Sequence, residues 1–239
     1  MNNKLSRRDF LQIAGAAAAA TTLAACGGAS LPAPTIPAAT PEPSSPTAEQ
    51  ALALLKDGNA RYVAAKMVRP NQSVDRRASL SAGQKPFAII FSCVDSRVPP
   101  ELAFDRGLGD LFVIRTAGHV IDRAALGSIQ FGVEELHIPL IVVMGHEKCG
   151  AVSATIETLE KNAHAAGDIE ALVQGIKPAI EKSKNQSGDK LDNAVKANTA
   201  LTVEALKANT ILGDEVKKGK LMIVGTRYDL DTGMVEMLV

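Results

Sequence analysis

Cys93, Asp95 and Arg97 stand at alternate positions directly after a run of apolar residues. A cysteine thiolate is a ligand for soft metal ions, and a carboxylate beside a guanidinium stays ionised and accepts hydrogen bonds. Side chains two residues apart point to the same side of an extended segment, so all three can face one site. This pattern favours a metal ion with a fixed hydrogen-bond acceptor beside it, which suits the activation of water.

A second group of metal-type residues follows another apolar run, residues 140–145. The run leads directly into His146-Glu147-Lys148-Cys149. Together with Cys93, this histidine and cysteine form a Cys₂His set, which Zn²⁺ binds while leaving a fourth position for water. Two other interpretations fit the same residues. They are buried cysteines with an ordinary core histidine, or a Cys93–Cys149 disulfide in an exported chain.

The composition indicates one aliphatic domain without nucleic-acid character. The 239 residues are 46% hydrophobic, which suffices for one sizeable core. The net charge is zero, so nothing points to a nucleic-acid partner. Trp is absent and aromatic residues make up only 3%, so the core must consist mainly of Ala, Val, Leu and Ile. Such a core suits helices packed on a sheet.

The N-terminal region predicts export. Ser6-Arg7-Arg8-Asp9-Phe10-Leu11 fits the twin-arginine pattern, and residues 1–25 are predicted to be a signal peptide. Leu23-Ala24-Ala25-Cys26 resembles a bacterial lipoprotein box, in which Cys26 would be lipidated; an ordinary cleavage site is the alternative. Residues 26–47 are rich in Pro, Ala and Thr and predict an extended tether. We expect a protein on the periplasmic or cell-surface side that meets the membrane only through this lipid anchor.

Residues 48–239 are predicted to form one domain in which strands alternate with helices. Strands are expected over 87–92, 111–115, 140–145, 221–228 and 234–239, the last one antiparallel. Helices are expected over 48–67, 75–82, 124–136, 150–159, 169–182 and 194–212. This order predicts an α/β fold with a mainly parallel central sheet flanked by helices. Functional groups collect at the carboxyl ends of such strands, so the two metal motifs can meet if their strands are neighbours.

The two motifs resemble those of the β-class carbonic anhydrases. That family carries Cys-x-Asp-x-Arg after one strand and His-x-x-Cys-Gly after another, here residues 93–97 and 146–150. Residues 112–119 and 228–233 are similar to two further segments of the family, so the resemblance covers roughly residues 48–239. It implies a parallel sheet with an antiparallel edge strand and an N-terminal helical arm that embraces a partner subunit. It also implies a homodimer or homotetramer.

The resemblance further implies an activity, the reversible hydration of CO2 to bicarbonate and a proton. One Zn²⁺ per subunit is expected on Cys93, His146 and Cys149, where it would carry a hydroxide. Asp95, held by Arg97, would orient that hydroxide toward CO2. In a closed state, Asp95 itself would become the fourth zinc ligand.

Gln84, Phe112 and Gly118 are the residues that the resemblance places against CO2 or bicarbonate, with part of the pocket coming from the second subunit. His119 is predicted to be a capping or loop histidine, and a proton relay is the alternative. Two other functions fit the same motifs. One is hydrolysis of COS or CS2 on this scaffold, and the other is a catalytically silent lipoprotein that binds zinc or bicarbonate. The intact Asp–Arg pair favours catalysis over the silent protein.

Overall fold

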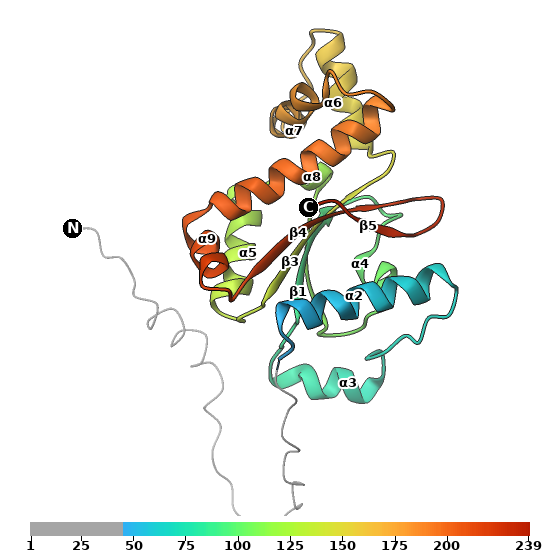
Figure 1. The fold of residues 1–239 in the computed structure, drawn as a ribbon, viewed down its shortest axis with the longest axis vertical. Helices are drawn as coiled ribbons and strands as arrows, with labels where there is room; N and C mark the ends of the chain where they lie inside the picture. The colour runs from blue at the N-terminus through green and yellow to red at the C-terminus, as the bar shows by residue number, and fades with distance from the viewer. Residues whose placement is uncertain (1–44) are drawn as a thin grey trace, which may run out of the picture. The chain divides into compact units, whose positions relative to one another are not determined.

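The computed structural model describes residues 45–239, whose strands form one five-stranded sheet in the order β2-β1-β3-β4-β5 (Figure 1). The strands are β1 (Ala88–Cys93), β2 (Leu111–Thr116), β3 (Leu140–His146), β4 (Met222–Tyr228) and β5 (Val235–Met237). The first four pair in parallel, and β5 runs antiparallel to β4. The predicted α/β fold with its antiparallel edge strand is therefore confirmed. The two motif-bearing strands, β1 and β3, are direct neighbours.

The first described helix is α2 (Ala48–Val63). Thr47 caps it, because its hydroxyl accepts a hydrogen bond from the backbone N–H of Gln50 while the Gln50 side chain accepts one from the Thr47 N–H. The helix packs on its own sheet through Ala51 and Leu55, and its contact with a partner subunit stays a prediction. The predicted signal peptide and Cys26 lie outside the described residues.

The remaining helices follow the predicted order with one correction. They are α3 (Val74–Ser79), α4 (Pro100–Ala103), α5 (Arg123–Glu134), α6 (Gly150–Glu160), α7 (Ile169–Ser183), α8 (Lys190–Ala208) and α9 (Thr210–Lys217). The prediction of a single helix over 194–212 was wrong, because the helix ends at Ala208 and a new one begins after Asn209. The Asn209 side chain accepts hydrogen bonds from the backbone N–H groups of Ile211 and Leu212, which begins a new helix. No helix within residues 45–239 is long and apolar enough to cross a membrane.

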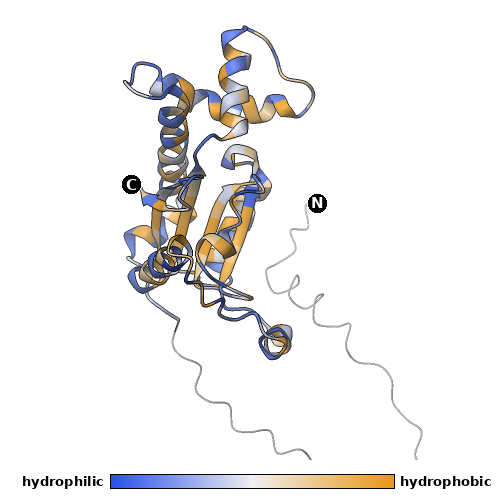
Figure 2. Ribbon diagram, turned by 90° about the vertical axis from the view of Figure 1, so that its right-hand side faces the viewer, coloured by the Kyte–Doolittle hydropathy of each residue, from blue (hydrophilic) through white to orange (hydrophobic). Residues whose placement is uncertain are grey.

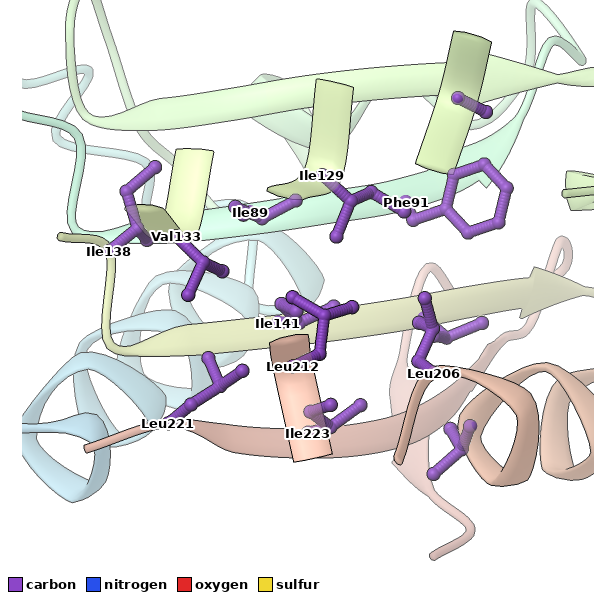
Figure 3. Packing of buried hydrophobic residues seen from close by; sticks show 13 residues of the cluster. Ile89, Phe91, Ile129, Val133, Ile138, Ile141, Leu206, Leu212, Leu221 and Ile223 are labelled. Carbon is purple, nitrogen blue, oxygen red and sulfur yellow. The ribbon is translucent and has the colours of Figure 1, made fainter. Parts of the chain in front are cut away.

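Helices cover both faces of the sheet. On one face, Ile89 and Phe91 of β1 pack with β3 and β4 against α5, α8 and α9 (Figure 3). On the other face, Ala88 and Ile90 of the same strand pack toward α2 and α4. Burial on both faces explains why the strands read as continuous apolar runs, which stand out at the centre of Figure 2.

A third, smaller apolar cluster lies at the carboxyl edge of the sheet. It contains Cys93 and Cys149 together with residues of α6, α7 and α8: Val152, Ile156, Ile176, Ala194 and Val195. These helices therefore bury the ends of the two motif-bearing strands. Charged or polar groups placed there are shielded from water, so each of them needs a partner within the protein.

Candidate active site

Cys93, His146 and Cys149 meet at the carboxyl ends of β1 and β3. Cys93 is the last residue of β1, His146 is the last residue of β3, and Cys149 immediately precedes α6. Their ligand atoms all lie within 4.8 Å of one another, and all three residues are buried. The structure thus brings together the three metal ligands that the sequence predicted.

The orientation of His146 suits a metal ligand. Its Nδ1 lies 2.9 Å from the carbonyl oxygen of Glu147 and donates a hydrogen bond to it, which leaves the unprotonated Nε2 facing the cluster. This Nε2 is buried and has no hydrogen-bond partner. A buried polar atom without a partner is costly, and a bound cation would remove that cost. The donor set therefore fits Zn²⁺, which favours thiolate and imidazole in a tetrahedral site.

The two cysteines are free thiols, so the structure contains no Cys93–Cys149 disulfide. A hydrogen bond from the Cys149 thiol holds the pKa of Cys93 well below its ordinary value, and His146 lowers it further. The same bond raises the pKa of Cys149, which donates it. The pair therefore favours a thiolate on Cys93 and a thiol on Cys149. A cation that displaces the shared proton would find a thiolate already in place.

Asp95 and Arg97 form the predicted pair beside this cluster. Arg97 donates from Nε to Asp95 Oδ1 at 2.9 Å and from Nη2 to Oδ2 at 2.7 Å, while its backbone N–H also reaches Oδ1. These hydrogen bonds lower the pKa of Asp95 to about 2, so the carboxylate is ionised. Asp95 Oδ2 lies 3.8 Å from His146 Nε2. Asp95 stands next to the three-residue cluster but is not part of it.

Arg115 is a functional residue that the sequence analysis missed. It extends from β2 and donates from Nε to the carbonyl oxygen of Cys93 at 2.7 Å, and from Nη2 to that of Asp95 at 2.6 Å. One guanidinium therefore fixes the backbone on both sides of Val94. The available signal was a charged residue at the end of the apolar run 111–114, on a strand that neighbours β1.

The turn after β4 holds the second motif in place. The sequence analysis did not predict this contact. The backbone N–H of Glu147 donates to the carbonyl oxygen of Tyr228 at 2.9 Å, and the Glu147 carboxylate accepts from the N–H of Leu230 at 3.1 Å. Lys148 reaches Asp231 at 3.3 Å on the surface. The loop between His146 and Cys149 is therefore anchored to a segment more than eighty positions later, which local sequence patterns do not reveal.

Two predicted substrate residues lie far from the metal ligands of their own chain. Gln84 precedes β1 at its amino end, and the length of β1 alone separates it from Cys93 by roughly 17 Å. Phe112 pairs in register with Ile89, four positions before the partner of Cys93, which is roughly 13 Å. Gln84 is exposed and lines a hollow of about 520 Å³ together with Arg77, Leu80 and Leu108.

Gly118, the third predicted substrate residue, lies beside Cys93 of the candidate ligand cluster. Its backbone N–H donates to Cys93 Sγ at 3.3 Å, and its φ of +61° explains the need for glycine. The next residue, His119, lies in the turn after β2, in line with the prediction of a capping or loop histidine, but its side chain is not exposed. Its ring is buried and packs edge-on against Phe91, with 6.3 Å between ring centroids. Burial lowers the pKa of His119 to about 4, so the ring is neutral at neutral pH.

The fold and this site define a class, namely an α/β protein whose parallel sheet carries, at its carboxyl edge, a Cys₂His cluster that could hold a metal ion. Residues 88–235 match the carbonic anhydrase family, and the chain belongs to that family. Carbonic anhydrase 2 of Mycobacterium tuberculosis is 45% identical over 180 residues, which cover 75% of this chain and 87% of that protein. Residues 4–24 match the signal sequence of the twin-arginine translocation pathway, which indicates export.

Solved structures agree with this assignment. The β-carbonic anhydrase of Coccomyxa aligns with a TM-score of 0.61 and 27% identity, covering 67% of this chain and 75% of that one. A tetrameric β-carbonic anhydrase of Sordaria macrospora shares the fold, with a TM-score of 0.62 and 20% identity over 68% of this chain and 85% of that one. The chain is therefore an enzyme of the β-class carbonic anhydrases, whose relatives support CO2 hydration as its activity.

Proposed function

We propose that this chain catalyses the reversible hydration of CO2 with one Zn²⁺ per subunit, held by Cys93 Sγ, His146 Nε2 and Cys149 Sγ. The observation that carries the proposal is the buried cluster itself, whose ligand atoms lie within 4.8 Å of one another around an unpartnered imidazole nitrogen. When bound at such a site, Zn²⁺ lowers the pKa of a water molecule to about 7 and so supplies a nucleophile at neutral pH.

Asp95 orients the attacking water. Its Oδ2 lies 3.8 Å from His146 Nε2 and would accept a hydrogen bond from a water molecule held beside the three ligand residues. The pKa of Asp95 is about 2, so the carboxylate does not take up a proton near neutral pH. We therefore assign it the role of a fixed acceptor rather than that of a general base.

Arg97 keeps Asp95 in this role. Its two side-chain hydrogen bonds occupy both carboxylate oxygens. In the closed state that the family resemblance implies, Asp95 would move onto the metal, and both bonds would have to break. The arrangement of the dyad in this structure therefore favours the open site.

We propose that Gln84 and Phe112 serve the metal centre of a partner subunit in a homodimer or homotetramer. Their distance from Cys93 along β1 and β2 supports this assignment, and so does the hollow beside Gln84. Gly118 would contact substrate from the same chain as the metal, because its backbone lies against Cys93.

The export signal does not specify where the enzyme stays after export, so its location is a further proposal. The twin-arginine signal supports placement on the periplasmic or cell-surface side of the membrane. We propose that Cys26 is the lipidated first residue of the mature protein. Mass spectrometry of the mature N-terminus tests this, since cleavage at another position without a lipid would contradict it.

The central test replaces Asp95 by Asn and compares it with Asp214→Asn, an exposed carboxylate paired with Lys217 in α9. Zinc per subunit and CO2 hydration would be measured across roughly pH 6 to 9. We expect one zinc per chain in all three proteins and a loss of turnover of about 10²-fold only in Asp95→Asn. A wild-type protein without zinc, or full activity in Asp95→Asn, would contradict the proposal.

A further inference from the structure

Asn198 is a buried polar residue that the proposed reaction does not use. It lies on the face of α8 that covers the sheet, and only 5% of it is exposed. Its Nδ2 donates to the carbonyl oxygen of Gly118 at 2.8 Å and contacts Nε2 of His119 at 3.0 Å. One amide group thus engages two successive residues of the turn that follows β2. Burial of an amide is favourable only when its hydrogen bonds are made.

The contact with Asn198 determines the state of His119. Because Nδ2 is a donor, His119 Nε2 must accept, and the ring proton must sit on Nδ1. A protonated ring would present two donors and repel the amide. The imidazole is therefore a neutral acceptor for the second N–H of the Asn198 amide.

The turn that Asn198 holds has an unfavourable backbone conformation. Gly118 and His119 both have positive φ, at +61° and +44°. A side chain in this region is strained, so the conformation of His119 needs support from its surroundings. The packing around it is close, since a Cβ at Gly118 would lie 2.7 Å from Ile176 Cδ1. A Cβ at Gly145 would lie 3.5 Å from His119 Cε1.

This conformation directs the Gly118 N–H at Cys93 Sγ, 3.3 Å away. We propose that Asn198 is a positioning residue, which acts through the Gly118 peptide to hold an N–H···S hydrogen bond on a metal-ligating thiolate. The inference rests on the proposed zinc site. Such a bond withdraws electron density from the sulfur, which strengthens the Lewis acidity of the bound ion, and it fixes the direction of the ligand.

The test compares Asn198→Leu, which nearly preserves the volume of the side chain, with Asn193→Leu on the same helix. Asn193 donates only to the carbonyl oxygen of Ser187 and is the matched control. In the Co²⁺-substituted protein, we expect the thiolate-to-metal charge-transfer band of Asn198→Leu to move to lower energy. We expect its zinc dissociation constant to rise by about tenfold or more. Asn193→Leu should match the wild type in both measurements.

A measurement on the wild-type protein tests the inference without relying on a variant that could misfold. In protein loaded with ¹¹³Cd²⁺, the N–H···S bond predicts a scalar coupling between the metal and the Gly118 amide proton, and its absence would overturn the inference. Asn198→Asp, which keeps the size but not both donors, provides a second variant and should lose the coupling. Failure of the wild type to bind metal at Cys93 would instead overturn the proposed function. Metal binding with an unchanged band and affinity in a folded Asn198 variant would overturn the inference alone.

Discussion

The two ends of β1 are built in opposite ways. At its carboxyl end, Cys93 is buried, and Arg115 and Gly118 tie the surrounding backbone and sulfur in place. At its amino end, Gln84 is exposed on an open hollow of about 520 Å³. The strand between them is fully buried. Strand β1 therefore leads to a buried cluster of side chains at its carboxyl end and to an exposed surface at its amino end.

The difference shows which part of the site a single chain can supply. Metal ligands must be held in a fixed geometry, so they are gathered within one chain and anchored by long-range hydrogen bonds. Substrate contacts at the amino end have no metal centre of their own nearby. Under the proposed assignment, Gln84 and Phe112 act on the metal site of a second subunit. Each chain would then supply the metal ligands of one site and substrate contacts of another.

The largest expected effect comes from removing one of the three candidate metal ligands. Cys149→Ser removes a thiolate ligand and leaves Cys93 without its hydrogen-bond donor. We expect loss of the zinc and a fall in CO2 hydration of at least about 10²-fold, together with a lower melting temperature, because metal binding and folding are coupled. Metal analysis, stopped-flow assay and thermal unfolding measure these effects. Zinc retained at full stoichiometry would contradict the assignment of Cys149.

A smaller effect is expected from replacing Gln84, before the amino end of β1. Gln84→Ala should keep its zinc and lose activity by roughly tenfold, because one substrate hydrogen bond is removed. The exposed Gln186, in the loop between α7 and α8, provides the matched control as Gln186→Ala. Steady-state kinetics of both variants, with zinc determined in parallel, measure the difference.

Mixed oligomers test which subunit Gln84 serves. Coexpression of Gln84→Ala with Asp95→Asn chains produces heterodimers in which one site has both residues intact if Gln84 acts across the interface. Activity of the purified heterodimer should then exceed that of either parent. If Gln84 serves its own chain, both sites of the heterodimer are defective, and no such gain would be seen.

The smallest expected effect concerns stability in acid. The pKa of His119 is about 4 in the folded chain because of burial, whereas an exposed histidine titrates near 6.5. The unfolded state therefore binds the proton first, and stability is lost as pH falls from about 6.5 toward 4, by at most about 1.4 kcal/mol per pH unit. His119→Asn should flatten this slope. His137 is an exposed histidine with a similar positive φ, and His137→Asn should leave the slope unchanged.

The sequence was sufficient for most of the fold. Both motif-bearing strands were predictable, because burial on two faces produces long apolar runs. The antiparallel edge strand was predictable from the turn residues that precede it. The helix break at Asn209 was not, since the apolar periodicity continues through it. The Asn209 side chain accepts hydrogen bonds from the first backbone N–H groups of α9, and this cap ends α8 although the apolar pattern continues.

The residue types of the metal site were determined by the sequence alone. Cysteine and histidine at these spacings carry their ligand chemistry wherever they lie, and the Asp–Arg pair is local, two positions apart. Only the tertiary structure decided that β1 and β3 are neighbours, that Arg115 and Asn198 hydrogen-bond to the backbone of Cys93 and Gly118, and that Gln84 is remote from Cys93. These relations join residues distant in sequence through strand pairing and helix packing, which no local spacing encodes.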